Sequence, residues 1–465
     1  MIEGLKPYPK MKDSGLPWCP HVPAHWDLVP NRAFLNQRKV LVGEKHSDYT
    51  LLSLTKQGVI VRDISENKGK FSADMGTSQE VRKGNLVMCL FDVPETPRTI
   101  GLSRHTGMIT SAYTVFEVRD DQAANWLEAF YISMDDRKLL SPLYSGLRHT
   151  IPKTRFLSTH TPLPAANERA AIIRFLTHAD GRIRQLIRSK QRLVALLEEQ
   201  KHTIIHHAVT RGLDQNVRLM PTGQEWIGDV PAHWDLVPNR AYLRLKKEVV
   251  GKRSGDYVLL SLTKRGIIAR DMENPEGKFP TSFDTYQVIE PGDFVFCLFD
   301  IDETPRAVGL STLHGMITGA YTRFACDPSI AEWVYLFYLA MDNGKRLKPL
   351  YTGLRKVITK SRFLGAKIPM PPPEERIRLV AEVEHATRGA TDAISRAQRE
   401  IDLLKEFRTR LISDVVTGRL DVRDAAARLP AEDLEGDDPL DDTDTDGEED
   451  DDSPIESDAE DGDGG

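Results

Sequence analysis

VPAHWDLVPNRAFL, residues 22–35, recurs almost unchanged as VPAHWDLVPNRAYL at residues 230–243, an offset of 208. LLSLTKQGVIVRD and LLSLTKRGIIARD repeat at the same offset, and so do two later segments that agree at 19 of 28 positions. The second copy then loses one residue, so that Trp126 corresponds to Trp333. A fixed internal period of this kind predicts one structural unit built twice.

Each copy begins with a strand pattern and ends with a helical one. Short runs rich in β-branched and aromatic residues, such as YTLLSL, GVIVR and NLVMCLF, lie between glycine and proline turns and predict strands. After TPLPAANER and IPMPPPEER the apolar residues adopt a 3-4 spacing, which predicts helices from near Glu168 to Ala208 and from near Glu374 to Val416. The expected apolar seams are Leu176, Ala179, Ile183, Leu186, Leu193 and Leu197 in the first helix and Leu379, Val383, Ala386, Ala390, Ala393, Ala397, Leu404 and Leu411 in the second.

Helices of about 40 residues would be about 60 Å long, which is too long for burial inside one domain. An apolar seam alone usually indicates domain core, so it is the length and the repetition that favour a spacer. We expect the two helices to pack on each other as an antiparallel coiled coil with pseudo-two-fold symmetry, in an α+β fold. The expected parts are a globular domain at 1–165, a long helix at 166–210, a second globular domain at 211–372, a second long helix at 373–425 and a disordered acidic tail at 426–465.

Charge is distributed unevenly along the chain. The formal net charge is −7, but residues 431–465 hold 19 acidic and no basic residues, which leaves 62 basic against 50 acidic residues in positions 1–430. The positive body indicates an anionic partner, and the tail is too acidic and too poor in apolar residues to become ordered. Two roles stay open for the tail, a solubilising extension and a competitor for the same cations.

The cellular compartment and the state of the cysteines are predicted from the apolar stretches and the cysteine spacing of the sequence. The sequence shows no signal-peptide pattern near its start and no later stretch of about 20 apolar residues, so we expect a cytoplasmic protein. Its four cysteines, Cys19, Cys89, Cys297 and Cys326, form no CxxC pair, which favours buried free thiols over a zinc site or a disulfide framework.

Three places in each copy combine a turn with side chains that could contact an anionic partner, and a nucleic acid is one such partner. Arginine can pair bidentately with guanine and glutamine with adenine, although exposed turns are polar in most proteins. The candidates are Lys56, Gln57, Arg104, His105, Arg148 and His149 in the first copy and Lys264, Arg265, His314, Arg355 and Lys356 in the second. The loops FDVPETPR and FDIDETPR add Arg98 and Arg306. Their carboxylates, Asp92 with Glu95 and Asp300 with Glu303, are interpreted as turn and ion-pair residues rather than as metal-nuclease ligands.

Two further aromatic and histidine groups receive structural interpretations. Trp26 and Trp234 could stack on bases, but the nearly unchanged VPAHWDLVP around them favours core packing. His206 and His207 lie near the predicted end of the first helix, where a cation suits the helix dipole. We assign no metal site to these histidines because the neighbouring sequence offers no further ligands.

A family resemblance appears once these motifs are assembled. KDSGLPWCPHVPAHWDLVP and its copy PTGQEWIGDVPAHWDLVP resemble the opening of each half of the specificity subunits of type I restriction-modification enzymes. SGLRHTIPKTRF and TGLRKVITKSRF, each followed by a proline-rich helix start, resemble that family's junction between a target recognition domain and its long helix. The likeness covers residues 8 to about 425, so only the acidic tail lies beyond it.

The resemblance implies a subunit that reads a split target in double-stranded DNA. It also implies two methyltransferase subunits and two ATP-driven restriction/translocase subunits as partners. No cofactor is then expected on this chain, because S-adenosylmethionine, ATP and magnesium would belong to the partners.

The sequence lacks the motifs of the catalytic classes that would compete with this interpretation. It contains no GxxxxGK[ST] loop, no GxGxxG after a strand and no Asn-Pro-Pro-aromatic tetrapeptide, so we expect a non-catalytic protein and disfavour a self-sufficient nuclease. A stand-alone DNA-binding regulator stays open as the alternative. Because the copies are so similar, the two half-sites are expected to be similar and inverted, with Gln57 against Arg265 among the differences that break the symmetry.

Overall fold

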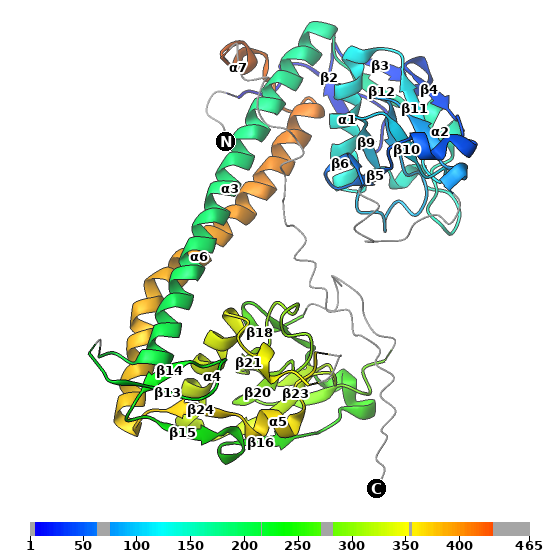
Figure 1. The fold of residues 1–465 in the computed structure, drawn as a ribbon. Helices are drawn as coiled ribbons and strands as arrows, with labels where there is room; N and C mark the ends of the chain where they lie inside the picture. The colour runs from blue at the N-terminus through cyan, green and yellow to red at the C-terminus, as the bar shows by residue number, and fades with distance from the viewer. Residues whose placement is uncertain (1–4, 63–74, 215, 271–281, 353–355, 431–465) are drawn as a thin grey trace. The chain divides into compact units, whose positions relative to one another are not determined.

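The computed structural model describes residues 5–62, 75–214, 216–270, 282–352 and 356–430. The described chain divides into two compact units (Figure 1). Of the described residues, one unit joins those up to 191 to residues 399–430, and the other comprises those between 192 and 398. Each unit therefore holds one globular domain and part of each long helix. The predicted acidic tail begins inside helix α7 (Arg423–Ala427) and, from residue 431 onward, lies outside the described residues.

The globular domain of the first unit is built on a four-stranded antiparallel sheet with the order β4-β11-β8-β9. Helix α1 packs on this sheet and buries Trp126 and Phe130 completely. Four two-stranded pairs, β1-β2, β3-β12, β5-β6 and β7-β10, surround the sheet. The elements are β1 (Met11–Asp13), β2 (His21–Pro23), β3 (Asp27–Pro30), β4 (Leu35–Arg38), β5 (Leu52–Thr55), β6 (Gly58–Val61), β7 (Gln79–Val81), β8 (Leu86–Met88), β9 (Ile100–Leu102), β10 (Gly107–Ile109), β11 (Thr114–Val118), α1 (Asp121–Asp136), α2 (Lys153–Ser158) and β12 (His160–Leu163).

The domain of the second unit repeats this arrangement element for element. Its sheet has the order β16-β23-β20-β21, and helix α4 buries Trp333 and Phe337 as α1 buries their counterparts. The elements are β13 (Leu219–Pro221), β14 (Asp229–Pro231), β15 (Asp235–Pro238), β16 (Leu243–Lys246), β17 (Leu260–Thr263), β18 (Gly266–Ala269), β19 (Gln287–Ile289), β20 (Asp293–Phe296), β21 (Val308–Leu310), β22 (Gly315–Ile317), β23 (Thr322–Cys326), α4 (Pro328–Asn343), α5 (Lys360–Gly365) and β24 (Lys367–Met370).

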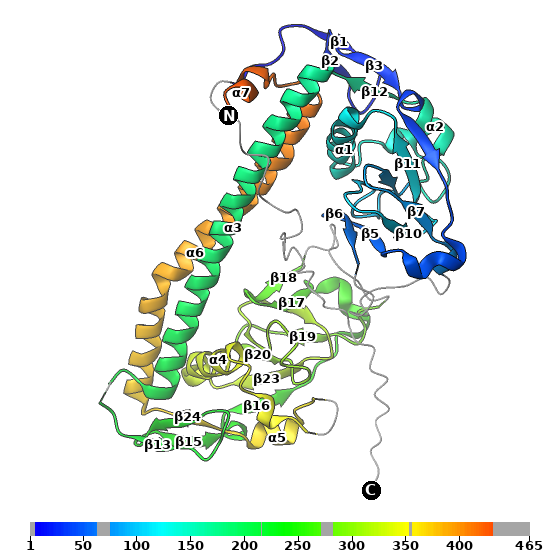
Figure 2. The same ribbon diagram turned by 45° about the horizontal axis from the view of Figure 1, so that its top comes forward.

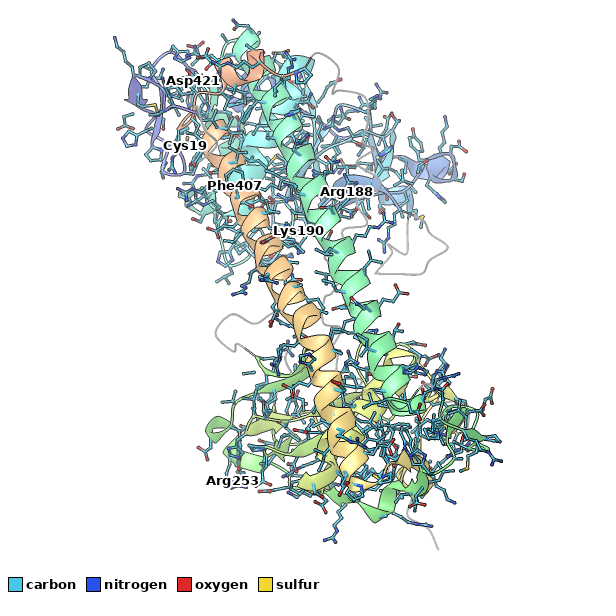
Figure 3. The ribbon with its side chains drawn as sticks, turned by 90° about the vertical axis from the view of Figure 1, so that its left-hand side faces the viewer. Cys19, Arg188, Lys190, Arg253, Phe407 and Asp421 are labelled. Carbon is cyan, nitrogen blue, oxygen red and sulfur yellow. The ribbon has the colours of Figure 1, made fainter. Side chains whose placement is uncertain are left out.

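The two long helices are α3 (Ala166–Arg211) and α6 (Pro373–Val416), and they pair in an antiparallel sense. In the first unit Asp180 of α3 accepts hydrogen bonds from Arg408 of α6, and Lys190, ten residues further along α3, pairs with Glu400, eight residues earlier in α6. Figure 3 labels Lys190 on α3 and shows the two helices side by side. In the second unit the C-terminal part of α3 shares one buried apolar cluster with the N-terminal part of α6.

The predicted apolar seams are only partly correct. Leu176 and Ile183 are buried as expected, but Leu186 and Leu193 are 49% and 46% exposed. Ile187 is buried in place of Leu186. A straight helix of 3.6 residues per turn drifts away from a strict seven-residue repeat, so a seam extended over the whole helix leaves the contact face.

Both long helices end in the same way, although the chain continues differently. Gly418 and Gly212 follow the helix ends with φ of +71° and +73°, a left-handed conformation that suits glycine at this position. After α3 the chain passes directly into strand β13 of the second domain. After α6 it meets the N-terminal segment instead, where the Asp421 N–H donates to the Lys6 carbonyl at 2.8 Å. The first unit therefore needs both ends of the chain to complete the same junction.

Candidate DNA interface

The turn between β5 and β6 and its copy between β17 and β18 present their predicted contact residues to solvent. Lys56, Gln57, Lys264 and Arg265 are all exposed. Each turn is a two-residue loop closed by a threonine and a glycine that pair across the hairpin. Figure 2 shows each hairpin at the end of its domain away from the strands next to the long helices. These side chains are therefore open to solvent on a part of each domain remote from its long helices.

Arg98 and Arg306 are mostly buried and already have partners. Arg98 Nη1 lies 2.7 Å from Asp136 Oδ1, and Arg306 Nη1 lies 3.2 Å from Asp342 Oδ2. Their side chains are only 14% and 10% exposed. These contacts fasten the loop after the central strand to the C-terminal end of α1 or α4. DNA binding by the two arginines stays a prediction, and the structure gives each of them a scaffolding contact.

The GLR segment of the first copy forms a short hairpin that pairs with the same loop. Arg148 donates from both Nε and Nη2 to the Asp92 carboxylate, with Nε 3.2 Å from Oδ1, and its guanidinium lies 5.6 Å from the centre of the Phe91 ring. The hydrogen bond from Arg148 holds the pKa of Asp92 below its usual range. His149 Nδ1 lies 3.8 Å from Glu95 Oε1. Asp92 is therefore an ion-pair residue, as predicted, and Glu95 lies beside a histidine.

In the second copy a lysine replaces His149 and binds two carboxylates. Lys356 Nζ lies 3.3 Å from Asp302 Oδ2 and also pairs with Glu303. The hydrogen bond to Glu303 raises the pKa of Lys356 most, and the hydrogen bond to Asp302 raises it further. Asp300, the sequence counterpart of Asp92, adopts a left-handed backbone conformation in the turn, with a φ of +43°. Arg355 lies outside the described residues.

The third predicted place lies on a different part of the domain. Arg104 Nη2 is 3.1 Å from Glu128 Oε2, on helix α1, and His105 beside it is half-buried. Glu128 precedes Asp136, the partner of Arg98, by eight residues, which corresponds to about 12 Å along the helix. The Arg104 loop therefore contacts α1 well before the helix end that binds Arg98. The equivalent loop of the second unit carries His314, which is exposed.

In the second unit, hydrogen bonds connect the β17–β18 turn with the loop that carries Arg306. Arg306 Nη2 lies 3.5 Å from the carbonyl oxygen of Lys264 in the β17–β18 turn. Lys345, just after α4, donates to the Thr304 carbonyl at 2.7 Å and to Asp342 at 2.9 Å. These contacts link the β17–β18 turn and the loop that carries Arg306 to the C-terminal end of α4.

The sequence interpretation missed two residues next to His314. The His314 ring packs edge-on against Tyr257, with ring centres 5.4 Å apart, and the Arg253 guanidinium lies 5.8 Å from the Tyr257 ring centre. Arg253 comes from the KRSGDY segment just before the β17 strand. Its counterpart EKHSDY is also rich in charge, and this repeated feature could have identified the segment. A cation, a phenol ring and an imidazole here extend the candidate surface beyond the predicted turns.

The tryptophan interpretation is confirmed, because Trp26 and Trp234 are buried. Each anchors a domain to the start of a long helix. Trp26 Nε1 donates to Glu168 at 3.0 Å, and Trp234 Nε1 donates to Glu375 at 3.1 Å. Tyr8 adds a second donor to Glu168, at 2.6 Å. These residues join each domain to its long helix, and burial leaves the two tryptophans unavailable for stacking on bases.

The described part of the chain holds neither a candidate metal site nor a candidate membrane-spanning helix. No group of three or more His, Cys, Asp and Glu residues there could hold a metal ion. No described helix is long and apolar enough to span a bilayer.

Burial, with a contribution from Arg346, lowers the pKa of His206. The lower pKa disfavours the cationic role that the sequence predicted for His206 at the helix end.

Comparison with known proteins gives a match in fold but none in sequence. No protein-family model matches the sequence, and no curated protein matches it. A chain from a structure described as "Structural basis underlying complex assembly and conformational transition of the type I R-M system" matches with a TM-score of 0.51 and 12% identity, over 85% of this chain and 98% of that chain. The protein therefore has the fold of a component of a type I restriction-modification system, and the predicted fold class is confirmed.

Two further structures match less well. They are the HsdS subunit from Thermoanaerobacter tengcongensis (TM-score 0.36, 14% identity) and the type I restriction-modification S subunit from M. genitalium (TM-score 0.34, 13% identity). The matches cover 86% and 84% of this chain and 97% and 96% of theirs. Because both TM-scores are below 0.5, the fold assignment does not rest on them.

Proposed function

We propose that this protein is the DNA-reading specificity subunit of a type I restriction-modification complex. The observation that supports this best is one domain-and-helix unit built twice, in a fold shared with nearly the full length of a chain from such a system. Each domain also exposes cations on a rigid turn, Lys56 in the first and Arg265 in the second. Cations of this kind neutralise phosphates, while neighbouring polar side chains read base edges.

The target is a two-part sequence in double-stranded DNA, with one part read by each domain. The nearly identical scaffolds favour similar half-sites in inverted orientation, because related domains on an antiparallel helix pair follow the pseudo-symmetry of the duplex. Gln57 and Arg265 occupy equivalent turn positions but prefer different bases, adenine and guanine. The target is therefore close to a palindrome, with differences at the positions that these two residues read.

Catalysis belongs to the partners in this proposal. The subunit docks two methyltransferase subunits and two restriction/translocase subunits, which bring S-adenosylmethionine, ATP and magnesium. The absence of the corresponding motifs from the sequence supports this division. So does the fold match to a chain from a structure concerned with assembly of a type I system.

Mapping of methylated adenines in the host genome, with and without this gene, tests the proposal. We expect methylation at one two-part sequence to disappear on deletion and to return on complementation. Two unrelated half-sites would refute the near-palindromic target alone. Unchanged methylation would refute the specificity-subunit function. If the pure protein then still bound DNA and no methyltransferase co-purified with it, the stand-alone regulator would be favoured.

Binding measurements on turn variants test the assignment of the interface. Lys56→Ala is expected to weaken binding to all duplexes and to reduce the slope of log K against log salt by about 0.9. Gln57→Ala should instead weaken binding to the preferred sequence and leave the slope unchanged. Lys10→Ala, which removes an exposed lysine of the N-terminal segment, is the matched control and should change neither quantity. Equal effects of Lys56→Ala and Lys10→Ala would contradict the assignment.

A further inference from the structure

Leu147 is the most exposed of the large apolar side chains that the structure describes, with a relative exposure of 101%. It occupies the apex of the hairpin formed by residues 145–150 and belongs to none of the buried apolar clusters of the described chain. A lone exposed leucine is common on ordinary surfaces and by itself indicates nothing. Here, however, the tripeptide GLR recurs at 353–355, where the residues on both sides differ between the copies. Those three residues lie outside the described chain, so the inference concerns Leu147 alone.

The backbone holds this apex in a defined conformation. Ser145 and Thr150 exchange two hydrogen bonds across the hairpin, of 2.8 and 3.1 Å. Gly146 and His149, on either side of the apex, adopt φ of +69° and +41°. The buried Ile151 then ties the base of the hairpin to the loop after β8 through a backbone hydrogen bond of 2.8 Å. Leu147 is therefore presented to solvent from a rigid support.

The charge around the apex favours an anionic ligand. The carboxylate loop (residues 92–98) and the segment from the end of α1 into α2 (residues 135–155) contain six lysines or arginines against four aspartates or glutamates. Arg148 adjoins Leu147 directly, and Lys153 is exposed at the start of α2. Apolar side chains on cationic supports enter DNA by inserting between neighbouring base pairs. A leucine retained in both copies suits such a contact, because insertion does not require a particular base sequence.

We propose that Leu147 enters the duplex as an apolar wedge at one base step of the half-site read by the first domain. The inference rests on the proposed function and adds a role that base reading does not provide. Opening a base step lowers the cost of extruding a nearby base from the stack. The wedge would thus prepare the DNA for a methyltransferase that must take its adenine out of the helix.

Duplexes that carry 2-aminopurine at successive positions of the mapped target test the wedge, with the full chain in complex with its methyltransferase. Wild type is expected to raise the fluorescence at one step, where stacking is lost. Leu147→Ala should abolish that rise and weaken binding roughly tenfold, since it removes most of the side chain that the duplex would bury. Leu147→Met keeps an apolar side chain of similar size and should retain the signal. Leu245→Ala, which truncates a 49% exposed leucine on β16, is the matched control and should behave as wild type.

The failures of the wedge and of the proposed function are distinguishable. Sequence-specific binding by wild type without a fluorescence rise at any step would overturn the wedge and leave DNA reading intact. Absence of sequence-specific binding by wild type would instead overturn the proposed function. If Leu147→Ala bound DNA normally but no longer co-purified with the methyltransferase, Leu147 would be a protein contact, and the wedge would again be overturned.

Discussion

Glu168 provides the sharpest stability prediction, because one carboxylate serves two buried donors. Its Oε1 accepts from Tyr8 Oη at 2.6 Å and from Trp26 Nε1 at 3.0 Å, while its Oε2 lies 2.9 Å from His25 Nε2. Tyr8 and Trp26 are both buried. A buried donor left without an acceptor costs about 1–3 kcal/mol, so Glu168→Ala is expected to lose about 2–6 kcal/mol of unfolding free energy.

Two other variants make this test specific. Glu168→Gln keeps one carbonyl oxygen for both buried donors and should cost less than about 1 kcal/mol, since only the contact with the half-exposed His25 changes. Glu375→Ala leaves one buried donor, Trp234, and should cost about 1–3 kcal/mol. Urea unfolding followed by tryptophan fluorescence measures the loss, and amide hydrogen exchange identifies the unit that opens. If Glu168→Gln were as destabilised as Glu168→Ala, the negative charge of Glu168 would be essential. The explanation from the number of buried donors left without an acceptor would then be refuted.

Three further predictions concern pH, packing and thiols. Burial raises the pKa of Tyr131 to about 12, whereas a tyrosine of the unfolded chain ionises near pH 10. The contribution of Tyr131 to the free energy of unfolding is therefore complete below about pH 10 and is lost as the pH rises toward 12. A urea midpoint that stays constant up to pH 11 would contradict this. Gly107→Ala places a Cβ 2.3 Å from the Thr50 carbonyl oxygen and should lower the free energy of unfolding by more than about 2 kcal/mol. Gly181→Ala in α3 meets no atom within 4 Å and should raise it by up to about 1 kcal/mol, so similar urea midpoints for the two variants would refute the close packing at Gly107. Burial raises the pKa of Cys326, the most accessible cysteine, to about 12, and the other three are buried, so alkylation at pH 8 should be at least about tenfold slower in native than in urea-unfolded protein; equal rates would exclude buried thiols.

Much of the fold could be predicted from the sequence because the evidence for it is local or repeated. The offset between the two copies indicated two similar units, and the proline before each run of 3-4 spacing marked the start of a long helix. Trp26 was assigned to the core because its surroundings hardly change between the copies. Each of these signals can be recognised without knowing which distant residues meet.

The remaining features depend on contacts between residues far apart in the chain. Neither the partnership of Tyr8 with Glu168 nor that of Arg98 with Asp136 has a sequence signal, because loops and helix ends bring these residues together only in the folded domain. Leu186 follows the expected spacing and is nevertheless exposed, since the contact face is set by the partner helix. The residues that contact bases stay predictions for a related reason, because exposed polar turns look alike whether or not they bind DNA.

The junction between Lys6 and Asp421 has a consequence for how the protein is synthesised. The second unit is complete once residue 398 has been made, whereas the first unit waits for the part of α6 and the segment that follow. At about 5–20 residues per second, roughly 200 residues of translation separate the two halves of that first unit by about 10–40 seconds. During this interval the N-terminal domain lacks its closing segment and stays open to proteases and chaperones. A ribosome that stalls soon after residue 398, within α6, leaves a chain in which only the second unit can close.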